Sequence, residues 1–380
     1  MPVCHQINLQ QSFGGGEVYT RIFSEALIAL GWEVELYIAR GAGFWRELNM
    51  AGVRLHEASS EAEILDALPA ERSLVVTHTA ASPGFAAVLA QRHRLTGFVH
   101  MPLYERNPAG FACYQRLFAV SRHVLDSARA RGLSNLHPEP MYGVADLALR
   151  PGATADELRM GSVYDWDRRK FRDRLLGAMT PLAGALLPRP VFARRPGLTL
   201  GIVSRLTPIK QFPHMFSLLA PVLEKYPQVN LEIFGSGGYA SVRDLKRALA
   251  PARRQVRYWG HQADVAAVYG QLDCVLSGLP EKEALGLNLI EAQYCGTPVL
   301  AVNAPPFTET VVDGASGWLF EDPRRDGGQS FDQLLGHLVA GVARPDPRHA
   351  VAHLARFSRE AFRQRVSVAL ANTATLATPG

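Results

Sequence analysis

The sequence predicts an α/β protein built from two doubly wound parallel sheets. Short apolar runs alternate with longer amphipathic stretches over most of the chain, which is the pattern of strands and crossover helices. The alternation fails between residues 151 and 197, and 380 residues are too many for a single core. We therefore expect an N-terminal domain at 1–187, a linker at 188–197, a C-terminal domain at 198–356, and a final helix at about 357–380 that packs back on the first domain.

In the first half, Val, Ile, Leu and Tyr dominate the short runs, whereas the longer stretches repeat apolar residues every three or four positions. Glycine and proline between them mark where the elements end. The strands are predicted at 3–9, 33–38, 53–55, 74–77, 97–100 and 117–120, and the helices at 16–30, 44–50, 61–67 and 111–117.

In the second half the same alternation returns after a stretch rich in proline and arginine. Strands are predicted at 198–203, 230–234, 256–258, 274–276, 298–301 and 317–320, helices at 212–225, 240–250, 264–271, 287–294 and 306–312, and a helical tail at 345–376. Two such domains joined by a linker imply a cleft. Because parallel sheets bind ligands beyond the carboxyl ends of their strands, we look for site residues directly after the strands.

The composition excludes several classes of protein. No apolar run reaches the ~18–20 residues that cross a bilayer, and the N-terminus lacks the basic and apolar segments of a secretory signal. The four cysteines form no CxxC pair, which favours reduced thiols in a cytoplasmic protein over disulfides or a metal site. The net charge of +5 is modest and no basic–aromatic motif is present, so we expect no nucleic-acid partner.

Basic residues gather at 168–174, 189–195 and 243–257. Such clusters are most often solvated helix faces, but they can also bind phosphates or an anionic membrane surface.

Two glycine-rich turns follow predicted strands. Gly15 and Gly16 open the first helix, where backbone amides and the positive helix end suit an anionic or oxygen-rich ligand; a tight turn is the alternative. Gly235 and Gly237 belong to a G-x-G-x-x-A pattern, which alone would suggest a nicotinamide or flavin site. It follows a later strand of its domain, and no acidic strand end stands out about 20 residues on, so we disfavour a dinucleotide oxidoreductase.

Cations and carboxylates follow other strands of the second half. Arg205 and Lys210, five positions apart in one loop, can face the same diphosphate and compensate its charge as a leaving group. Glu283 precedes the helix 287–294, and Glu291 lies on it, so both carboxylates can accept hydrogen bonds from sugar hydroxyls. The amides near Gly286 and Leu287 can bind phosphate.

These motifs resemble those of retaining glycosyltransferases of family four. LTLGIVSRLTPIKQF is similar to the family's cationic loop, NLEIFGSGG to its strand and glycine turn, and EALGLNLIEAQYCGTPVLA to its E-x7-E block. GGGEVYTRIFSEALIALGWEVELY resembles the opening glycine loop and helix. The resemblance implies the GT-B fold, in which two Rossmann-like domains face each other across a cleft.

The resemblance also implies residue roles. Arg205 and Lys210 would bind the donor diphosphate, Glu283 the transferred sugar and Glu291 the ribose, while His100 would reach the donor sugar. The loop 258–261 would lie against the base. Further donor contacts would come from backbone amides and from this loop, at Gly15, Gly16, Gly235, Gly237, Tyr258, Trp259, Gly286 and Leu287. Neither a metal nor another cofactor is expected.

Three features depart from the family pattern. Pro305 and Pro306 stand where small residues are usual, Gln211 stands where glycine is common, and the segment 153–179 looks inserted.

The expected function is therefore that of a retaining hexosyltransferase (EC 2.4) that moves a sugar from a GDP- or UDP-sugar to a hydroxyl acceptor. The acceptor would be a saccharide or lipid-linked saccharide of polysaccharide or glycoconjugate synthesis, handled in the cytoplasm or peripherally at the inner membrane face. The alternatives are a non-catalytic sugar-nucleotide-binding protein and a GT-B nucleotide-sugar epimerase.

Overall fold

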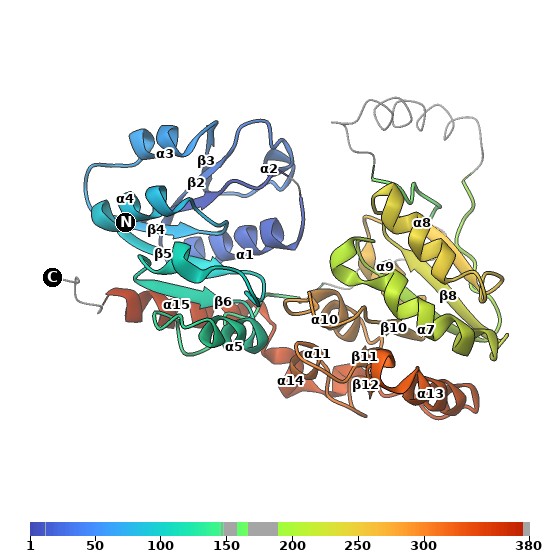
Figure 1. Ribbon diagram of the computed structural model, residues 1–380. Helices are drawn as coiled ribbons and strands as arrows, with labels where there is room; N and C mark the ends of the chain where they lie inside the picture. The colour runs from blue at the N-terminus through green and yellow to red at the C-terminus, as the bar shows by residue number, and fades with distance from the viewer. Residues whose placement is uncertain (12, 146, 148–157, 166–188, 375–380) are drawn as a thin grey trace. The chain divides into compact units, whose positions relative to one another are not determined.

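The computed structural model describes residues 1–11, 13–145, 147, 158–165 and 189–374 (Figure 1). The chain folds as two compact units, one formed by Met1–Val144 with Ala355–Gly380 and the other by Ala145–Leu354. Each unit contains a six-stranded sheet in which all neighbouring strands are parallel.

The N-terminal sheet has the strand order β3-β2-β1-β4-β5-β6, so the chain runs outward from β1 and then crosses to β4 on the other side. Its strands are β1 (Val3–Asn8), β2 (Glu33–Ala39), β3 (Val53–Ala58), β4 (Leu74–Thr77), β5 (Arg94–Val99) and β6 (Arg116–Ala119). Its helices are α1 (Gly15–Ala29), α2 (Phe44–Glu47), α3 (Glu61–Ala67), α4 (Pro83–Arg92), η1 (Pro108–Phe111) and α5 (Arg122–Ala130).

Helices cover both faces of this sheet. Figure 1 shows α3 and α4 on one side of the strands and α1 with α15 (Arg359–Ala374) on the other. Tyr19 of α1 and Phe362 of α15 meet edge to face with ring centroids 5.5 Å apart, and both side chains are buried. The end of the chain therefore completes the core of the N-terminal unit.

The C-terminal sheet has the order β12-β11-β10-β7-β8-β9. Its strands are β7 (Leu198–Val203), β8 (Val229–Phe234), β9 (Val256–Gly260), β10 (Cys274–Leu276), β11 (Val299–Val302) and β12 (Gly317–Phe320). Its helices are η3 (Pro208–Lys210), α7 (Phe212–Glu224), α8 (Tyr239–Ala248), α9 (Val265–Tyr269), α10 (Leu287–Tyr294), α11 (Phe307–Thr310), α12 (Pro323–Asp326), α13 (Gln329–Val339), η4 (Pro347–His349) and α14 (Val351–Ala355). Helix α7 packs with α8, α12 and α13, and α9 packs with α10.

The structure corrects several predicted elements. The predicted helix at 111–117 is wrong, because the backbone after η1 turns into β6, which pairs with β5. The pattern analysis missed α4, although Ser82 caps it and Pro83 begins it, and it missed α12 and α13. The tail is not one helix, since Ser358 caps α15 by accepting a hydrogen bond from the amide of Ala361.

The border between the units differs from the predicted domain limits. Residues 158–165, which the sequence placed with the N-terminal domain, pack on the C-terminal unit through isolated β-bridges from Arg159 to Val191 and from Tyr164 to Gly237. Most of the segment 153–179 and the basic cluster 168–174 lie outside the described residues.

The predicted linker at 188–197 is tied to the C-terminal sheet by charge. Arg194 pairs with Asp273 at 2.5 Å and Arg195 pairs with Glu232 at 3.0 Å, and both carboxylates are buried. Arg257 also pairs with Glu232, at 2.6 Å. These arginines of the second and third basic clusters are therefore structural rather than part of a solvated patch.

Candidate functional site

The predicted site residues of the C-terminal unit gather beyond the carboxyl ends of its strands. A cavity of about 160 Å³ opens there, between the loops that follow β7, β8 and β9 and the helices α9 and α10. Its lining includes Arg205, Gly235 and Glu291 from the predicted set, and the full lining is Val203, Ser204, Arg205, Phe234, Gly235, Ser236, His261, Gln262, Val265, Tyr269, Asn288 and Glu291.

A second charged group lies in the same loop. Lys210 ends the turn η3 and forms an ion pair with Glu283, and the two side chains are only 20% and 14% exposed. The other carboxylate oxygen of Glu283 accepts a hydrogen bond from the amide of Ala284 at 3.2 Å. The structure thus brings together the cation and the carboxylate that the sequence assigned to the diphosphate and the sugar.

The backbone around Lys210 has little freedom. Its carbonyl accepts a hydrogen bond from the amide of Leu279 at 3.3 Å, and a Cβ at Gly278 would lie 2.5 Å from that carbonyl oxygen. The next residue, Gln211, has φ of 52°, in the left-handed region that favours glycine. The departure from the family's usual glycine therefore falls at a position where the backbone itself prefers glycine.

The glycine turn after β8 is shaped by packing. A Cβ at Gly235 would lie 1.9 Å from the carbonyl oxygen of Ser204, and one at Gly237 would lie 2.1 Å from that of Leu206. The amides of these two glycines already donate to Gly260 and Val163, at 2.7 and 3.0 Å. Both glycines therefore allow the Arg205 loop to approach closely, and neither amide is left for a phosphate.

Helix α10 starts at the edge of the site. Gly286 precedes it with φ of 83° and the helix has no side-chain cap. A Cβ at Gly286 would lie 3.2 Å from the ring of Phe307, which follows the cis Pro305–Pro306 peptide. Asn288 ties the first turn to β7 by donating to the carbonyl of Val203 at 3.1 Å. The positive end of α10, with Leu287 in its first turn, is thus held beside β7, the strand that precedes the Arg205 loop.

Glu291 is a partly buried carboxylate with few partners. It accepts a hydrogen bond from the hydroxyl of Tyr269 at 3.1 Å. Burial raises the pKa of the Glu291 carboxyl, although the Tyr269 bond and the charge of Lys210 oppose that rise. Because a carboxylate can accept about four hydrogen bonds, Glu291 retains capacity for ligand hydroxyl groups in the cavity.

The structure places the two aromatic residues predicted to face the base elsewhere. Trp259 is 2% exposed, packs on Phe192, and donates its indole N–H to Glu232 at 2.7 Å. Tyr258 points to the opposite face of β9, where Lys246 lies 5.3 Å from its ring centroid. Of the loop 258–261 that was predicted to lie against the base, His261 lines the cavity, together with Gln262, which follows it.

The predicted residues of the N-terminal unit also follow strands. Gly14, Gly15 and Gly16 have no left-handed φ, and a Cβ at Gly15 or Gly16 would meet nothing within 4 Å, which disfavours the tight-turn interpretation. His100 follows β5 and meets Tyr19 edge to face at 5.1 Å. Burial lowers the pKa of His100 to about 4, so this imidazole is neutral at physiological pH.

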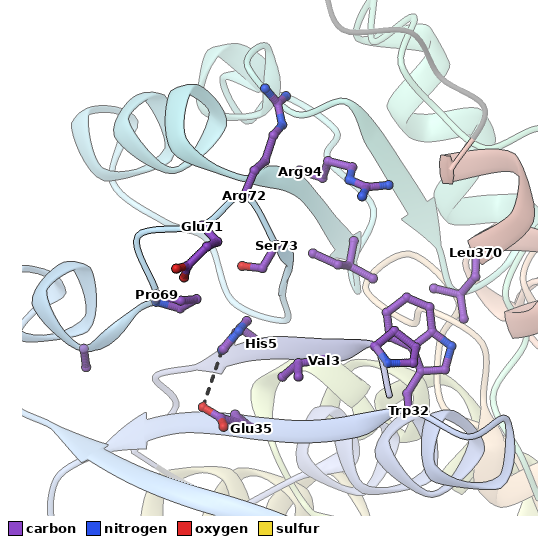
Figure 2. A pocket seen from close by; sticks show the side chains of 13 residues that line it. Val3, His5, Trp32, Glu35, Pro69, Glu71, Arg72, Ser73, Arg94 and Leu370 are labelled. Carbon is purple, nitrogen blue, oxygen red and sulfur yellow. Dashed lines mark ion pairs between the residues drawn. The ribbon is translucent and has the colours of Figure 1, made fainter.

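A second hollow, of about 570 Å³, lies at the amino-terminal edge of the N-terminal sheet, opposite to the edge that His100 follows (Figure 2). Val3, Leu74 and Arg94 begin β1, β4 and β5 there, and His5 lies 3.6 Å from Glu35. Ligand sites of parallel sheets lie at the carboxyl edge, so we base the candidate site on the cavity of the C-terminal unit.

Two kinds of feature are absent from the part of the chain that the structure describes. No group of three or more His, Cys, Asp or Glu side chains there is arranged to hold a metal ion. Among the helices of the same ranges, none is both long and apolar enough to cross a bilayer.

Sequence reasoning missed four side chains at the carboxyl edges of the two sheets. Tyr269, Asn288 and Gln262 line the cavity, and His78 stacks beside His100 with ring centroids 5.8 Å apart. Asn288 and His78 could have been predicted from the sequence, because Asn288 stands at the start of a predicted helix and His78 directly after a predicted strand. Tyr269 had none, because it ends a short helix and reaches Glu291 only through the tertiary fold.

Comparisons with known proteins agree with this geometry. Residues 192–329 match the family model described as glycosyl transferases group 1. The chain is 33% identical over 176 residues to D-inositol 3-phosphate glycosyltransferase of Segniliparus rotundus, covering 43% of this chain and 37% of the relative. It is 32% identical over 171 residues to the enzyme of the same name from Mycobacterium leprae, covering 43% and 39%. The chain thus spans less than half the length of either relative.

Solved structures match over almost the whole chain. Anabaena HepE in complex with UDP has a TM-score of 0.72 at 16% identity and covers 98% of this chain and 100% of its own. Sucrose-phosphate synthase from Thermosynechococcus elongatus has a TM-score of 0.70 at 16% identity, covering 98% and 99%. The chain therefore has the two-domain GT-B fold, and its C-terminal unit carries a region of the glycosyl transferases group 1 type.

Proposed function

We propose that the protein is a retaining glycosyltransferase (EC 2.4) that moves a hexosyl group from a nucleoside diphosphate sugar to a hydroxyl acceptor. The observation that carries this proposal is the cavity at the carboxyl edge of the C-terminal sheet, where Arg205 and Glu291 share one lining. The match to glycosyl transferases group 1 over residues 192–329 supports it.

The donor would lie along this edge. Arg205, Lys210 and the positive end of α10 would bind the diphosphate, and Glu291 would accept hydrogen bonds from the ribose hydroxyls. The remaining wall, His261 and Gln262, would then face the base. Glu283 would contact the transferred sugar once the donor diphosphate competes for Lys210.

The chemistry we propose needs positive charge more than a nucleophile. The nucleoside diphosphate departs through an oxocarbenium-like state, the acceptor hydroxyl attacks from the same face, and the leaving phosphate takes the acceptor proton. Arg205 and Lys210 stabilise the charge that develops on the leaving group, which is the role a metal has in other enzymes. His100 acts as a neutral hydrogen-bonding group, because its pKa of about 4 keeps it uncharged.

The acceptor we propose is a saccharide or lipid-linked saccharide, used in the cytoplasm or at the inner membrane face. A membrane contact predicts that the protein pellets with liposomes in proportion to their anionic lipid. Equal pelleting with neutral and anionic liposomes contradicts that part of the proposal.

Nucleotide binding is the first test. We expect one of UDP, GDP, ADP and dTDP to raise the melting temperature of the wild type without magnesium, and not that of Glu291→Ala. A ligand at 100 times its Kd adds about 2.7 kcal/mol of stability. UDP is the first choice because HepE was solved with UDP and with UDP-glucose. No shift with any nucleotide would overturn the proposal.

Turnover is the second test. We expect Lys210→Ala to lower kcat by about 10²–10³, while Lys225→Ala, an exposed lysine of the same unit paired with Asp332, leaves it unchanged. Donor binding without transfer to any acceptor would instead indicate a binding protein, and conversion of the donor sugar without an acceptor would indicate an epimerase.

A further inference from the structure

Residues 158–165, which we call the edge segment, lie outside the range matched by the family model, yet they contact both glycine-containing loops of the cavity wall. The segment runs beside β9, an edge strand of the sheet. Leu158 anchors its start: the side chain is 2% exposed and the carbonyl accepts a hydrogen bond from the amide of Phe192 at 2.8 Å.

The first set of contacts holds the end of β9 and the loop that follows it. The amide of Gly161 donates to the carbonyl of Trp259 at 2.8 Å. Gly260 has φ of 70°, and a Cβ there would lie 2.5 Å from the carbonyl oxygen of Ser162. The edge segment therefore lies so close to this loop that only glycine fits at 260.

Gln262 completes this first set through its side chain. Its amide nitrogen donates to the carbonyls of Arg159 and Trp259, both at 2.9 Å. Because a primary amide has two N–H groups, both donors are used, and the group that Gln262 offers to a ligand is its carbonyl oxygen Oε1.

The second set of contacts holds the loop after β8. The carbonyl of Val163 accepts from the amide of Gly237 at 3.0 Å, and the amide of Asp165 donates to the carbonyl of Gly237 at 2.9 Å. The adjacent Ser236 lines the cavity and accepts, through its carbonyl, from the amide of Leu206 at 2.8 Å. One short segment thus fixes the spacing of two cavity walls and, through Leu206, the loop of Arg205.

We propose that the edge segment is part of the donor site and that it makes Gln262 a specificity-determining residue for the nucleobase. This inference rests on the proposed function, which places the base against His261 and Gln262. A carbonyl oxygen held by two hydrogen bonds on its own amide only accepts, so it selects a base that presents an N–H group at that point. The edge segment is the positioning element, because it supplies the Arg159 carbonyl and holds the loop.

The test compares Gln262→Leu with Gln228→Leu, an exposed glutamine of the same unit. Kd is measured by calorimetry for UDP, GDP and ADP, and kcat and KM are measured with the sugar donor of the preferred base. We expect Gln262→Leu to weaken the preferred nucleotide about tenfold and to reduce its advantage over the next one to within about twofold. KM rises accordingly, kcat at saturating donor stays within twofold, and Gln228→Leu matches the wild type.

A second variant tests the edge segment itself. A Cβ at Gly161 would lie 3.3 Å from the carbonyl oxygen of His261, so Gly161→Ala pushes the loop without removing a hydrogen-bonding group. We expect KM for the donor to rise about two- to threefold with kcat unchanged, and the effect to be less than multiplicative with that of Gln262→Leu, because both act through one loop.

The outcomes separate this inference from the proposed function. If the wild type binds a nucleotide but Gln262→Leu keeps its full affinity and preference, the inference is overturned and the proposed function stands. Equal weakening of all three nucleotides with a lowered melting temperature also overturns it, because that result indicates a purely structural role. If the wild type binds no nucleotide, the proposed function itself fails.

Discussion

Two glutamates of the C-terminal unit, the buried Glu232 and the partly buried Glu291, are used in opposite ways. Glu232, in the middle of β8, has a fully buried side chain and accepts hydrogen bonds from Arg195, Arg257 and the indole of Trp259. Glu291, on α10 in the cavity lining, accepts from Tyr269 at 3.1 Å, and burial raises its pKa. The first carboxylate is saturated by the protein, whereas the second has capacity left.

The difference distinguishes structural from ligand-binding charge within one sheet. A buried carboxylate destabilises the fold unless its oxygens are satisfied, so the protein surrounds Glu232 with two guanidinium groups and an indole. An undersatisfied carboxylate in a cavity persists when a ligand completes its hydrogen bonds, and shifted pKa values gather at such sites. The two residues should therefore respond differently to the same substitution.

The largest effect on stability is expected from Glu232→Gln. Removing the charge leaves Arg195 and Arg257 facing a neutral amide. We expect a loss of about 3 kcal/mol in the free energy of unfolding, the low end for a broken buried pair, because the two arginine side chains are 25% and 28% exposed. Urea denaturation measures the loss, with the exposed Glu224→Gln as the control. A change below about 1 kcal/mol would show that the cluster is not structural.

Glu291→Gln should have the opposite effect, with a large loss of nucleotide affinity and little loss of stability. Nucleotide affinity is expected to fall about tenfold to a hundredfold, since hydrogen bonds to a charged group contribute about 1.5–3 kcal/mol. The free energy of unfolding should change by less than about 1 kcal/mol, because a poorly satisfied, partly buried charge is removed. Calorimetry and urea denaturation on the same variant test both parts. A variant that unfolds easily and binds normally would refute the distinction.

The raised pKa of Glu291 predicts opposite pH dependences for binding and stability. The folded state holds this proton to a higher pH than the unfolded state, whose pKa is about 4.3, so the contribution of Glu291 to stability falls as pH rises from there through the raised value. Nucleotide affinity should rise over that same interval, since the carboxylate is the form that accepts ribose hydroxyls. Calorimetry and thermal unfolding across pH measure the two trends, and Glu291→Gln should abolish both.

The smallest effect on stability is expected at Gln211, beside the site. The unfavourable feature there is the backbone conformation and not an unsatisfied charge. A left-handed φ destabilises a non-glycine residue by about 1–2 kcal/mol. Glycine, however, lowers the stability of the folded state by about 0.4–1 kcal/mol because it makes the unfolded chain more flexible. We therefore expect Gln211→Gly to raise the free energy of unfolding by about 0.5–1 kcal/mol. Gln211→Ala, which keeps the strain, should not stabilise. Equal effects of the two variants would argue against backbone strain.

Much of the fold could be predicted from the alternation of apolar runs. The strand 274–276 and the helix 287–294 were predicted with the bounds that the structure has, because each is short, apolar and flanked by turn residues. The helix predicted at 111–117 failed because pairing with β5 overrode a weak local pattern.

The candidate site was predictable in part for the same reason. Arg205, Lys210, Glu283 and Glu291 were found because loops after parallel strands share one edge of the sheet. Trp259 was misplaced because strand alternation turns its side chain into the core, where Glu232 receives its N–H. Tyr269 and Gln262 were missed because each acts through a partner distant in sequence, at 291 and 159.

The sequence by itself determined the two α/β domains, their strand and helix periods, and the loops that carry cations and carboxylates. These are local properties, decided by which side chains recur at a period of two or 3.6 residues. Only the tertiary structure decided which charged side chains have their hydrogen bonds satisfied by the protein and which keep acceptor capacity for a ligand. That outcome depends on residues brought together from distant parts of the chain, such as Arg195 with Glu232 and the edge segment with Gln262.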